Sequence, residues 1–279
     1  MKMLKMQGCI LTGAVAMLSL FSCSKKDDKN PPTTQAQKYV SSISYLYGPK
    51  NAIERNYSFR YDTLKHVTKG TRYMYSPWND IVYTNEGVYT DGKLSSIKGS
   101  NSNDVLYTKK FEYSANNITV IRWFDVSNQL FQVDSLFYDG KSQPQRIYTY
   151  RSDDHINLYL FEKQTGEYNN NGNMVAFKSD TLDINSGKYV TYLKEDFVYD
   201  DHPSYFTPGI LPFMNEVKLP MYSKNNPREA TQYWGINMSG TTLGGILINY
   251  DKEGYPNYQL GNVFYIGSGY NVALEYAIF

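Results

Sequence analysis

Beyond residue 23 the sequence contains no cysteine, and the whole chain has only Cys9 and Cys23. The bulk of the chain therefore has neither a disulfide nor a thiol nucleophile, and its stability must come from packing and backbone pairing. Histidine is also scarce. His66, His155 and His202 lie far apart, without the close spacing of a zinc site built from one segment. We therefore expect no metal and no cofactor.

The sequence also lacks an excess of charge. Its 28 lysines and arginines and 27 acidic residues give a formal net charge of +1, which falls to about −1 once Lys2 and Lys5 are removed with a signal peptide. A basic excess would favour nucleic acid or an anionic membrane face. No nucleic-acid partner is expected.

Sequence motifs of catalysis are missing too. No G-x-S-x-G, P-loop or G-x-G-x-x-G pattern occurs between a strand and a helix. Adjacent carboxylates occur at residues 153–154, 195–196 and 200–201. Neighbours on a strand point to opposite faces, so these pairs do not converge as the two carboxylates of a glycosidase must. We predict a non-catalytic protein; a hydrolase that uses carboxylates distant in sequence is the alternative.

The first 22 residues have the features of a secretory signal peptide. Lys2 and Lys5 precede an apolar run over residues 10–21, which is shorter than the about 20 residues of a membrane-spanning helix. The stretch Leu20-Phe21-Ser22-Cys23 resembles the lipobox of bacterial lipoproteins. This resemblance implies cleavage before Cys23 and attachment of lipid to its sulfur, and two or more acyl chains give stable membrane anchoring.

The next segment indicates the outer face of the cell. Ser24-Lys25-Lys26-Asp27-Asp28-Lys29 resembles the surface-export signal of Bacteroidota lipoproteins. The polar residues that follow, with Pro31-Pro32, are expected to form a flexible tether. We therefore predict a signal peptide (1–22), a lipidated cysteine with its tether (23–38) and one domain (39–279), anchored in the outer membrane and exposed at the cell surface.

Tyrosine is abundant, with 28 copies, and it alternates with polar residues. Tyr57, Phe59 and Tyr61 show a period of two, and so do residues 270–278. This period predicts β strands with one face more buried than the other, and pairs such as Asp91-Gly92 predict tight hairpins. No capped stretch with helical spacing of apolar residues occurs. The sequence therefore predicts an all-β antiparallel meander of consecutive hairpins, either barrel-like or strongly curved.

A degenerate repeat runs through the chain: an apolar residue, any residue, tyrosine and a turn former, as in Phe59-Arg60-Tyr61-Asp62. Its tyrosines are Tyr61, Tyr89, Tyr113, Tyr138, Tyr168, Tyr199 and Tyr250. Apart from the last, longer gap they lie 24–31 residues apart, which suits one hairpin with its connections. The last gap leaves room for a further degenerate unit near Tyr233.

This repeat is similar to the tyrosine–aspartate repeats of Rhs-type β shells. Together with the lipobox, it more closely resembles a family of Bacteroidota surface lipoproteins of unknown function with a porin-like fold. Residues 197–206, where a strand ends in tyrosine, aspartate and a proline-bearing loop, resemble that family's late segment, and residues 223–227 resemble the turn after it. The resemblance implies a fold and no known activity.

A membrane-spanning barrel is the alternative that the porin-like resemblance raises. Such a barrel needs a continuous apolar outer face. Glu195 and Asp196 interrupt the face between Tyr189 and Tyr199. Every second residue before Phe279 would share its face of the strand, and this set includes Glu275 and Asn271, so it is not apolar either. We therefore favour a lipid-anchored domain.

Residues 203–220 break the alternation, because prolines at 203, 208, 212 and 220 remove donors from any strand ladder. We expect a loop with one helical turn, whose apolar residues plug the sheet. A lid or binding loop is the alternative.

Binding is the function that the aromatic residues favour. Trp78 has a turn-like context, Trp123 follows a strand pattern and Trp234 precedes a glycine. Sugars stack their apolar faces on exposed rings, although each tryptophan can instead pack in the core. We predict capture of an extracellular ligand, a glycan first and a protein partner second. The alternative is a structural or accessory subunit of an outer-membrane protein complex, with the aromatics as interface anchors.

Overall fold

The computed structural model describes residues 37–47, 52–75, 81–102, 104–138, 140, 143–214, 218–234, 239–243, 247–260 and 270–279. The chain separates into two compact units, Met1–Gln37 and Lys38–Phe279. The predicted signal peptide, Cys23 and the export segment lie outside the described residues, so the fold below is that of the second unit.

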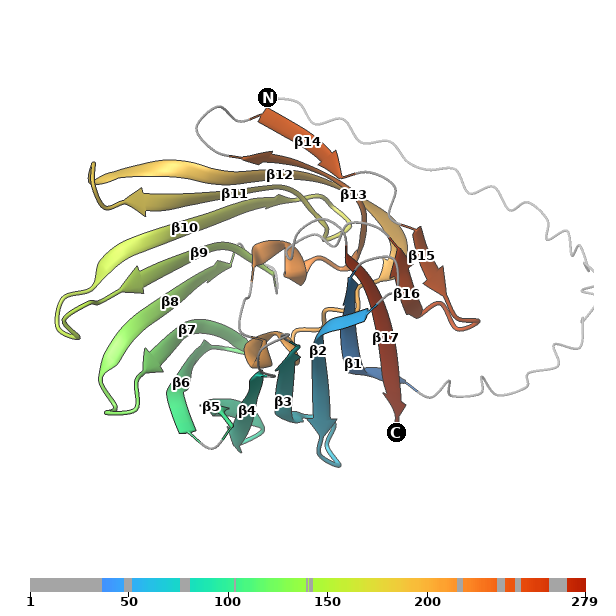
Figure 1. Cartoon of the computed structure of the whole chain (residues 1–279), viewed down its shortest axis with the longest axis horizontal. Helices are drawn as coiled ribbons and strands as arrows, with labels where there is room; N and C mark the ends of the chain where they lie inside the picture. Colours follow the sequence, from blue (N-terminus) through green and yellow to red (C-terminus); the bar gives the residue numbers. More distant parts are fainter. Residues whose placement is uncertain are drawn as a thin grey trace, which may run out of the picture. The chain divides into compact units, whose positions relative to one another are not determined.

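The described residues of the second unit form antiparallel β strands and two single turns of 3-10 helix (Figure 1). The first nine strands are β1 (Lys38–Tyr47), β2 (Ala52–Tyr61), β3 (Val67–Met74), β4 (Ile81–Thr90), β5 (Lys93–Asn101), β6 (Asp104–Ser114), β7 (Asn117–Phe124), β8 (Leu130–Tyr138) and β9 (Pro144–Arg151). The others are β10 (Tyr159–Tyr168), β11 (Met174–Asp183), β12 (Lys188–Pro203), β13 (Asn225–Trp234), β14 (Ser239–Leu243), β15 (Leu247–Tyr250), β16 (Pro256–Leu260) and β17 (Tyr270–Ile278). The 3-10 turns η1 (Leu211–Phe213) and η2 (Leu219–Tyr222) lie between β12 and β13.

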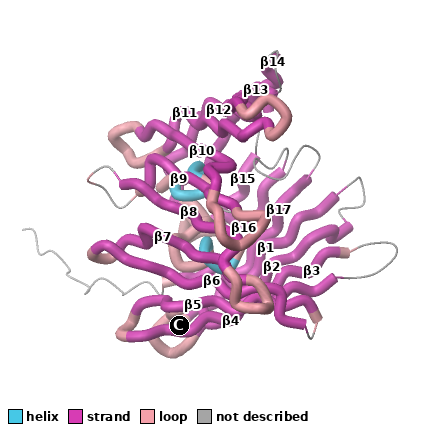
Figure 2. Tube along the Cα trace, turned by 90° about the vertical axis from the view of Figure 1, so that its left-hand side faces the viewer, coloured by secondary structure: helices cyan, strands magenta, loops and turns pink. Residues whose placement is uncertain are grey.

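The strands form one 17-stranded sheet in which most neighbours in the chain pair antiparallel. The last strand, β17, pairs with the first, β1. Within the described residues no ladder joins β14 to β15. The sheet is strongly curved and surrounds η1 and η2, which Figure 2 shows in cyan between the strands. The prediction of an all-β, strongly curved antiparallel meander is confirmed.

The described residues between β12 and β13, 204–214 and 218–224, fill the concave side of the sheet; we call them the insert. Ile210 and Leu211 are fully buried, and Phe213 and Met214 are 1% and 2% exposed. Phe213 occupies the space that two glycines leave open, since a Cβ atom on Gly87 would lie 2.6 Å from its ring. The predicted plug is confirmed, with two helical turns instead of one.

The repeated tyrosines have a common role that the structure reveals. Each of five hydroxyls donates to a backbone carbonyl of the preceding strand. The pairs are Tyr61 to Val40 (2.6 Å), Tyr89 to Val67 (3.0 Å), Tyr113 to Leu94 (3.0 Å), Tyr138 to Ile118 (2.9 Å) and Tyr168 to Pro144 (3.1 Å). The residue after the tyrosine often closes the turn: Asp62, Asn169 and Asp251 each accept two backbone N–H groups with one side-chain oxygen.

The predicted extra unit near Tyr233 is wrong. Tyr233 lies near the end of β13, at the start of the connection to β14, whereas the repeated tyrosines precede the hairpins at the other ends of the strands. The member that the sequence pattern missed is Tyr276 of β17, whose hydroxyl donates to the carbonyl of Pro256 at 2.7 Å.

One repeat hydrogen bond can be removed without changing the ring. We expect Tyr113→Phe to lower the free energy of unfolding by about 0.5–1.5 kcal/mol, because the carbonyl of Leu94 loses its partner. Denaturant unfolding of the variant measures this change. Tyr73→Phe is the matched control, since Tyr73 is 39% exposed and a change of less than about 0.5 kcal/mol is expected. Equal effects of both substitutions would contradict a structural role for the repeat.

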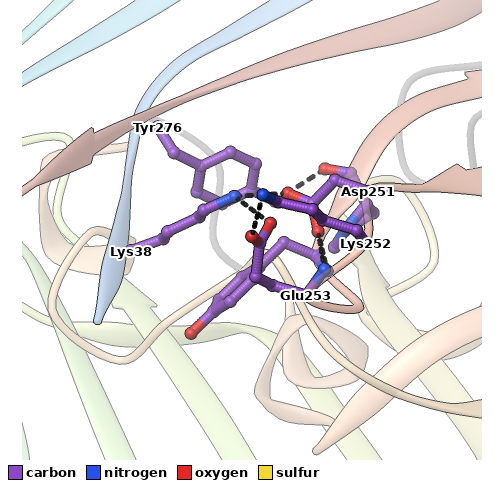
Figure 3. Close-up of polar contacts among 7 residues, drawn as sticks. Lys38, Asp251, Lys252, Glu253 and Tyr276 are labelled. Carbon is purple, nitrogen blue, oxygen red and sulfur yellow. Dashed lines mark hydrogen bonds and ion pairs between the residues drawn. The ribbon is translucent and has the colours of Figure 1, made fainter. Parts of the chain in front are cut away.

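An ionic contact ties the first strand to the β15–β16 turn (Figure 3). The Nζ of Lys38 donates to Asp251 Oδ2 at 2.6 Å and to Glu253 Oε2 at 2.9 Å. The hydrogen bonds that Lys38 donates to both carboxylates raise its pKa, so the lysine is charged. This contact holds Lys38, the first residue of the second unit, against a turn that is distant in sequence.

Candidate functional site

A cavity of about 480 Å³ lies between the concave face of β6–β10 and the insert. Its lining combines aromatic, apolar and hydrogen-bonding side chains. The residues are Tyr107, Lys109, Ile121, Trp123, Phe131, Gln132, Asp134, Leu136, Ile147, Thr149, Arg151, Glu162, Gln164, Pro212, Met214, Lys218 and Tyr222. This volume is in the range of small-molecule binding sites, which are mostly apolar with a few placed polar groups.

Strand register places the polar side chains of the cavity in two adjacent rows. One row runs from Lys109 through Trp123 and Gln132 to Arg151, each directly opposite the next. The other runs from Ile121 through Asp134 and Thr149 to Glu162. Side chains opposite each other on one face are close enough to interact, so five consecutive strands contribute to one surface.

Asp134 is the centre of the hydrogen bonds in the cavity. It is 8% exposed, and its carboxylate accepts from Trp123 Nε1 (2.7 Å), Thr149 Oγ1 (2.8 Å) and Gln132 Nε2 (3.1 Å). Burial raises the pKa of Asp134, and the three donors oppose that shift. The arrangement fixes the indole ring of Trp123 at the wall of the cavity.

Lys109 joins the sheet to the insert. It is 2% exposed, and its Nζ donates to the carbonyl of Pro212 at 3.0 Å and lies 4.2 Å from the ring centre of Trp123. Asn85 Nδ2 donates to the next carbonyl, that of Phe213, at 2.8 Å. Burial lowers the pKa of Lys109 to about 7, and the charge of Asp134 limits the shift. The insert therefore forms a fixed wall of the cavity.

Another cavity, of about 510 Å³, opens at the tyrosine-repeat ends of the strands. Tyr89, Tyr113 and Tyr138 line it together with Pro208 and Gly209 of the insert. Their hydroxyls are already bonded to backbone carbonyls. The cavity between β6–β10 and the insert offers more side-chain hydrogen-bonding groups and is the better candidate site.

The structure brings one of the three predicted tryptophans to this site. Trp123 lines the cavity and is half-buried. Trp78 lies outside the described residues, and so does Cys23. Trp234 is the last residue of β13, but its side chain is not described. A binding role for the three tryptophans therefore stays a prediction.

Sequence reasoning missed the charged members of the site. Lys109 and Asp134 point inward from strands whose inward neighbours are aromatic or apolar: Phe111 and Leu136 stand two residues away from them. A period of two puts residues i and i+2 on one face. A charged residue at a position where the alternation of the strand places apolar residues was therefore the sequence signal that could have identified Lys109 and Asp134.

The adjacent carboxylates do not form a paired centre. Glu195 is 1% exposed and accepts a hydrogen bond from Gln232, whereas Asp196 is half-buried. Burial raises the pKa of Glu195. Asp154 caps a turn, and backbone N–H groups hold its pKa well below the usual range. Asp200 accepts from the hydroxyl of Tyr250.

Two of the three histidines stack on repeat tyrosines, whereas the Nε2 of His155 lies 3.8 Å from Asp125 Oδ2. His66 stacks on Tyr89 with ring centres 4.6 Å apart, and His202 stacks on Tyr250 at 3.7 Å. In the part of the chain that the structure describes, no three potential metal ligands come together. Over the same residues, none of the helical segments is long and apolar enough to cross a bilayer.

The sequence matches no protein-family model and no curated protein. Among solved structures, a porin-like protein from Bacteroides uniformis is similar, with a TM-score of 0.51 and 12% identity over 86% of this chain and 98% of that chain. A porin-like protein from Bacteroides vulgatus follows, with a TM-score of 0.47 and 10% identity over 86% and 99%. The first likeness supports the fold.

Proposed function

We propose that the chain is a lipid-anchored protein of the outer membrane, attached through Cys23, that binds an extracellular glycan without altering it chemically. The observation that carries the binding proposal is the cavity of about 480 Å³, in which Trp123 and Phe131 stand beside Asp134, Gln132 and Arg151. The proposed location rests on the lipobox-like N-terminal sequence and on the likeness to porin-like proteins from Bacteroides.

The side chains of the cavity match the chemistry of a sugar. A pyranose has apolar C–H faces and a rim of hydroxyl groups that both donate and accept. Trp123 and Phe131 offer apolar ring surface, while carboxylates accept and amide or guanidinium groups donate. Because Asp134 is held by three donors, it is positioned before any ligand arrives, and this lowers the entropic cost of binding.

The two carboxylates of the cavity are arranged for binding. Asp134 and Glu162 lie two strands apart, with roughly 10 Å between their Cα atoms on the spacing of a sheet. Asp134 accepts hydrogen bonds from three donors, so both of its carboxylate oxygens are engaged. Glu162 accepts from the hydroxyl of Ser179 at 2.6 Å. Both groups are thereby engaged by the protein, so we favour binding over hydrolysis.

Removing the indole tests the proposal. We expect Trp123→Ala to abolish retardation of the full chain in gels that contain the polysaccharide it binds, because the ring that lines the cavity is lost. Affinity electrophoresis in a polyoxyethylene detergent, through gels containing different neutral polysaccharides, measures this. A detergent with a sugar head group would compete for the site.

Two comparisons make the result decisive. Phe137→Ala is the control, since Phe137 is 37% exposed on the same sheet and lines none of the cavities described here; it should migrate like the native chain. Circular dichroism establishes that the Trp123 variant is folded. If the native chain is not retarded by any polysaccharide, or if the folded Trp123 variant is retarded equally, the proposal is wrong.

A further inference from the structure

A smaller cavity of about 300 Å³ adjoins the candidate site. It lies over β10–β12 and shares two lining residues, Glu162 and Lys218, with the cavity of about 480 Å³. Phe161 and Tyr192 line only the smaller one. A third residue connects the two, because the guanidinium of Arg151 lines the larger cavity and lies 3.8 Å from the ring centre of Phe161. The two cavities are therefore consecutive along one concave surface.

Irregularities in three alternate strands place aromatic rings along this surface. The ladders skip Phe131 in β8, Phe161 in β10 and Tyr192 in β12, so each is the extra residue of a β-bulge. A bulge redirects a side chain away from the regular alternation and is enriched beside functional sites. Strands two apart are separated by roughly 10 Å. The three rings therefore lie at regular intervals across five strands.

The charge of the surface indicates the class of ligand. Lys109 donates to the carbonyls of Pro212 and Met214, and burial lowers its pKa to about 7, so it carries only part of a positive charge near neutral pH. Among the residues that the structure describes, the other charged side chains of the two cavities are two cations, Arg151 and Lys218, and two anions, Asp134 and Glu162. Balanced charges give no net attraction for an acidic or a basic polymer. An uncharged chain with many hydroxyl groups fits this surface.

We infer that the two cavities are consecutive subsites of one groove that binds an uncharged, linear oligosaccharide longer than a disaccharide. Trp123 and Phe131 hold one part of the chain, and Phe161 and Tyr192 hold the next. Glu162 and Lys218 contact it at the junction. This inference rests on the proposed function and specifies the length and charge of its ligand.

Calorimetric titration of the full chain with oligosaccharides of increasing length tests the inference. The probes are the malto-, cello- and xylo-oligosaccharide series, each from the disaccharide to the hexasaccharide, in a polyoxyethylene detergent. For the native chain, affinity in one series should rise at least about ten-fold beyond the disaccharide, equivalent to 1.4 kcal/mol of added contact. Tyr192→Ala should remove that gain and leave disaccharide affinity unchanged; Tyr192 is 57% exposed, so the variant should fold. Trp123→Ala should weaken binding at every length, and Phe137→Ala should change nothing.

The outcomes separate this inference from the proposed function. Native affinity that is the same for the disaccharide and the hexasaccharide would overturn the inference while leaving glycan binding in place. The inference would also be overturned if Tyr192→Ala lowered the affinity for the disaccharide and the hexasaccharide equally, or for neither of them. Absence of binding in all three series would contradict the proposed function itself, and the inference with it.

Discussion

Replacing Phe213 by alanine is expected to lower the free energy of unfolding by about 3–5 kcal/mol, the largest loss from any single side chain of the insert. Phe213 is 1% exposed and belongs to the core cluster formed by β1–β7, β17 and the insert. A Cβ atom added to Gly70 would lie 2.9 Å from the Cβ of Phe213, and one added to Gly87 would lie 2.6 Å from its ring. The strands there cannot close over the cavity left behind. Denaturant unfolding followed by circular dichroism measures the loss.

The complementary substitution tests the same contact from the sheet. Gly87→Ala adds a Cβ atom that would lie 2.6 Å from the Phe213 ring, so a loss of about 1–3 kcal/mol is expected from overpacking. In the double variant the alanine occupies space that Phe213 has vacated, and the two losses should not add. Phe137→Ala, on an exposed ring, should cost about 1 kcal/mol or less. Additive losses in the double variant would mean that the insert does not pack on Gly87.

Alkaline pH is expected to unfold the second unit through its tyrosines. Burial raises the pKa of Tyr89 and Tyr138 to about 12, and that of Tyr168, Tyr199 and Tyr276 further above its ordinary value. An unfolded tyrosine has a pKa of about 10. Above about pH 10 the unfolded chain therefore releases protons that the folded chain retains, so stability is complete below that pH and falls as pH rises through the folded pKa values.

This loss is measurable as one cooperative transition. Between pH 10 and about pH 12 the strand signal in circular dichroism should disappear, and the tyrosinate absorbance should rise in a step at the same pH. Exposed tyrosines should ionise at a lower pH than this step. Repeating the titration at high ionic strength separates the effect of burial from repulsion between like charges. Ionisation of all tyrosines near pH 10 with the strand signal intact would show that the repeat tyrosines are not buried donors.

The strand content was predictable because each strand shows its own periodicity. Phe59 and Tyr57 are buried where a period of two puts them, and Asp91 and Gly92 adopt the positive φ that the turn requires. The plugging of the sheet by the insert was predictable for a similar reason, since prolines exclude a strand while apolar residues require burial. In both cases the deciding interaction lies within a few residues of the chain.

The candidate site was not predictable because it depends on register. Asp134 meets Thr149 and Trp123 only once β7, β8 and β9 are aligned, and no local pattern sets that alignment. Phe161 and Tyr192 reach the groove through bulges, each of which adds one residue and shifts the alternation. The sequence identifies Trp123 as a candidate ligand-binding residue, but its hydrogen-bond partner Asp134 becomes known only from the pairing of the strands.

The pairing of β1 with β17 has a consequence for biogenesis. β1 acquires its second neighbour, β17, from a distant and later part of the chain. Until β17 has been made and has paired, β1 presents one open edge, and open edges are templates for aggregation. Contacts between the two ends of a chain also form slowly. We expect removal of β17 to lower the yield of folded protein more than its small loss of buried surface suggests, because β1 then keeps an open edge.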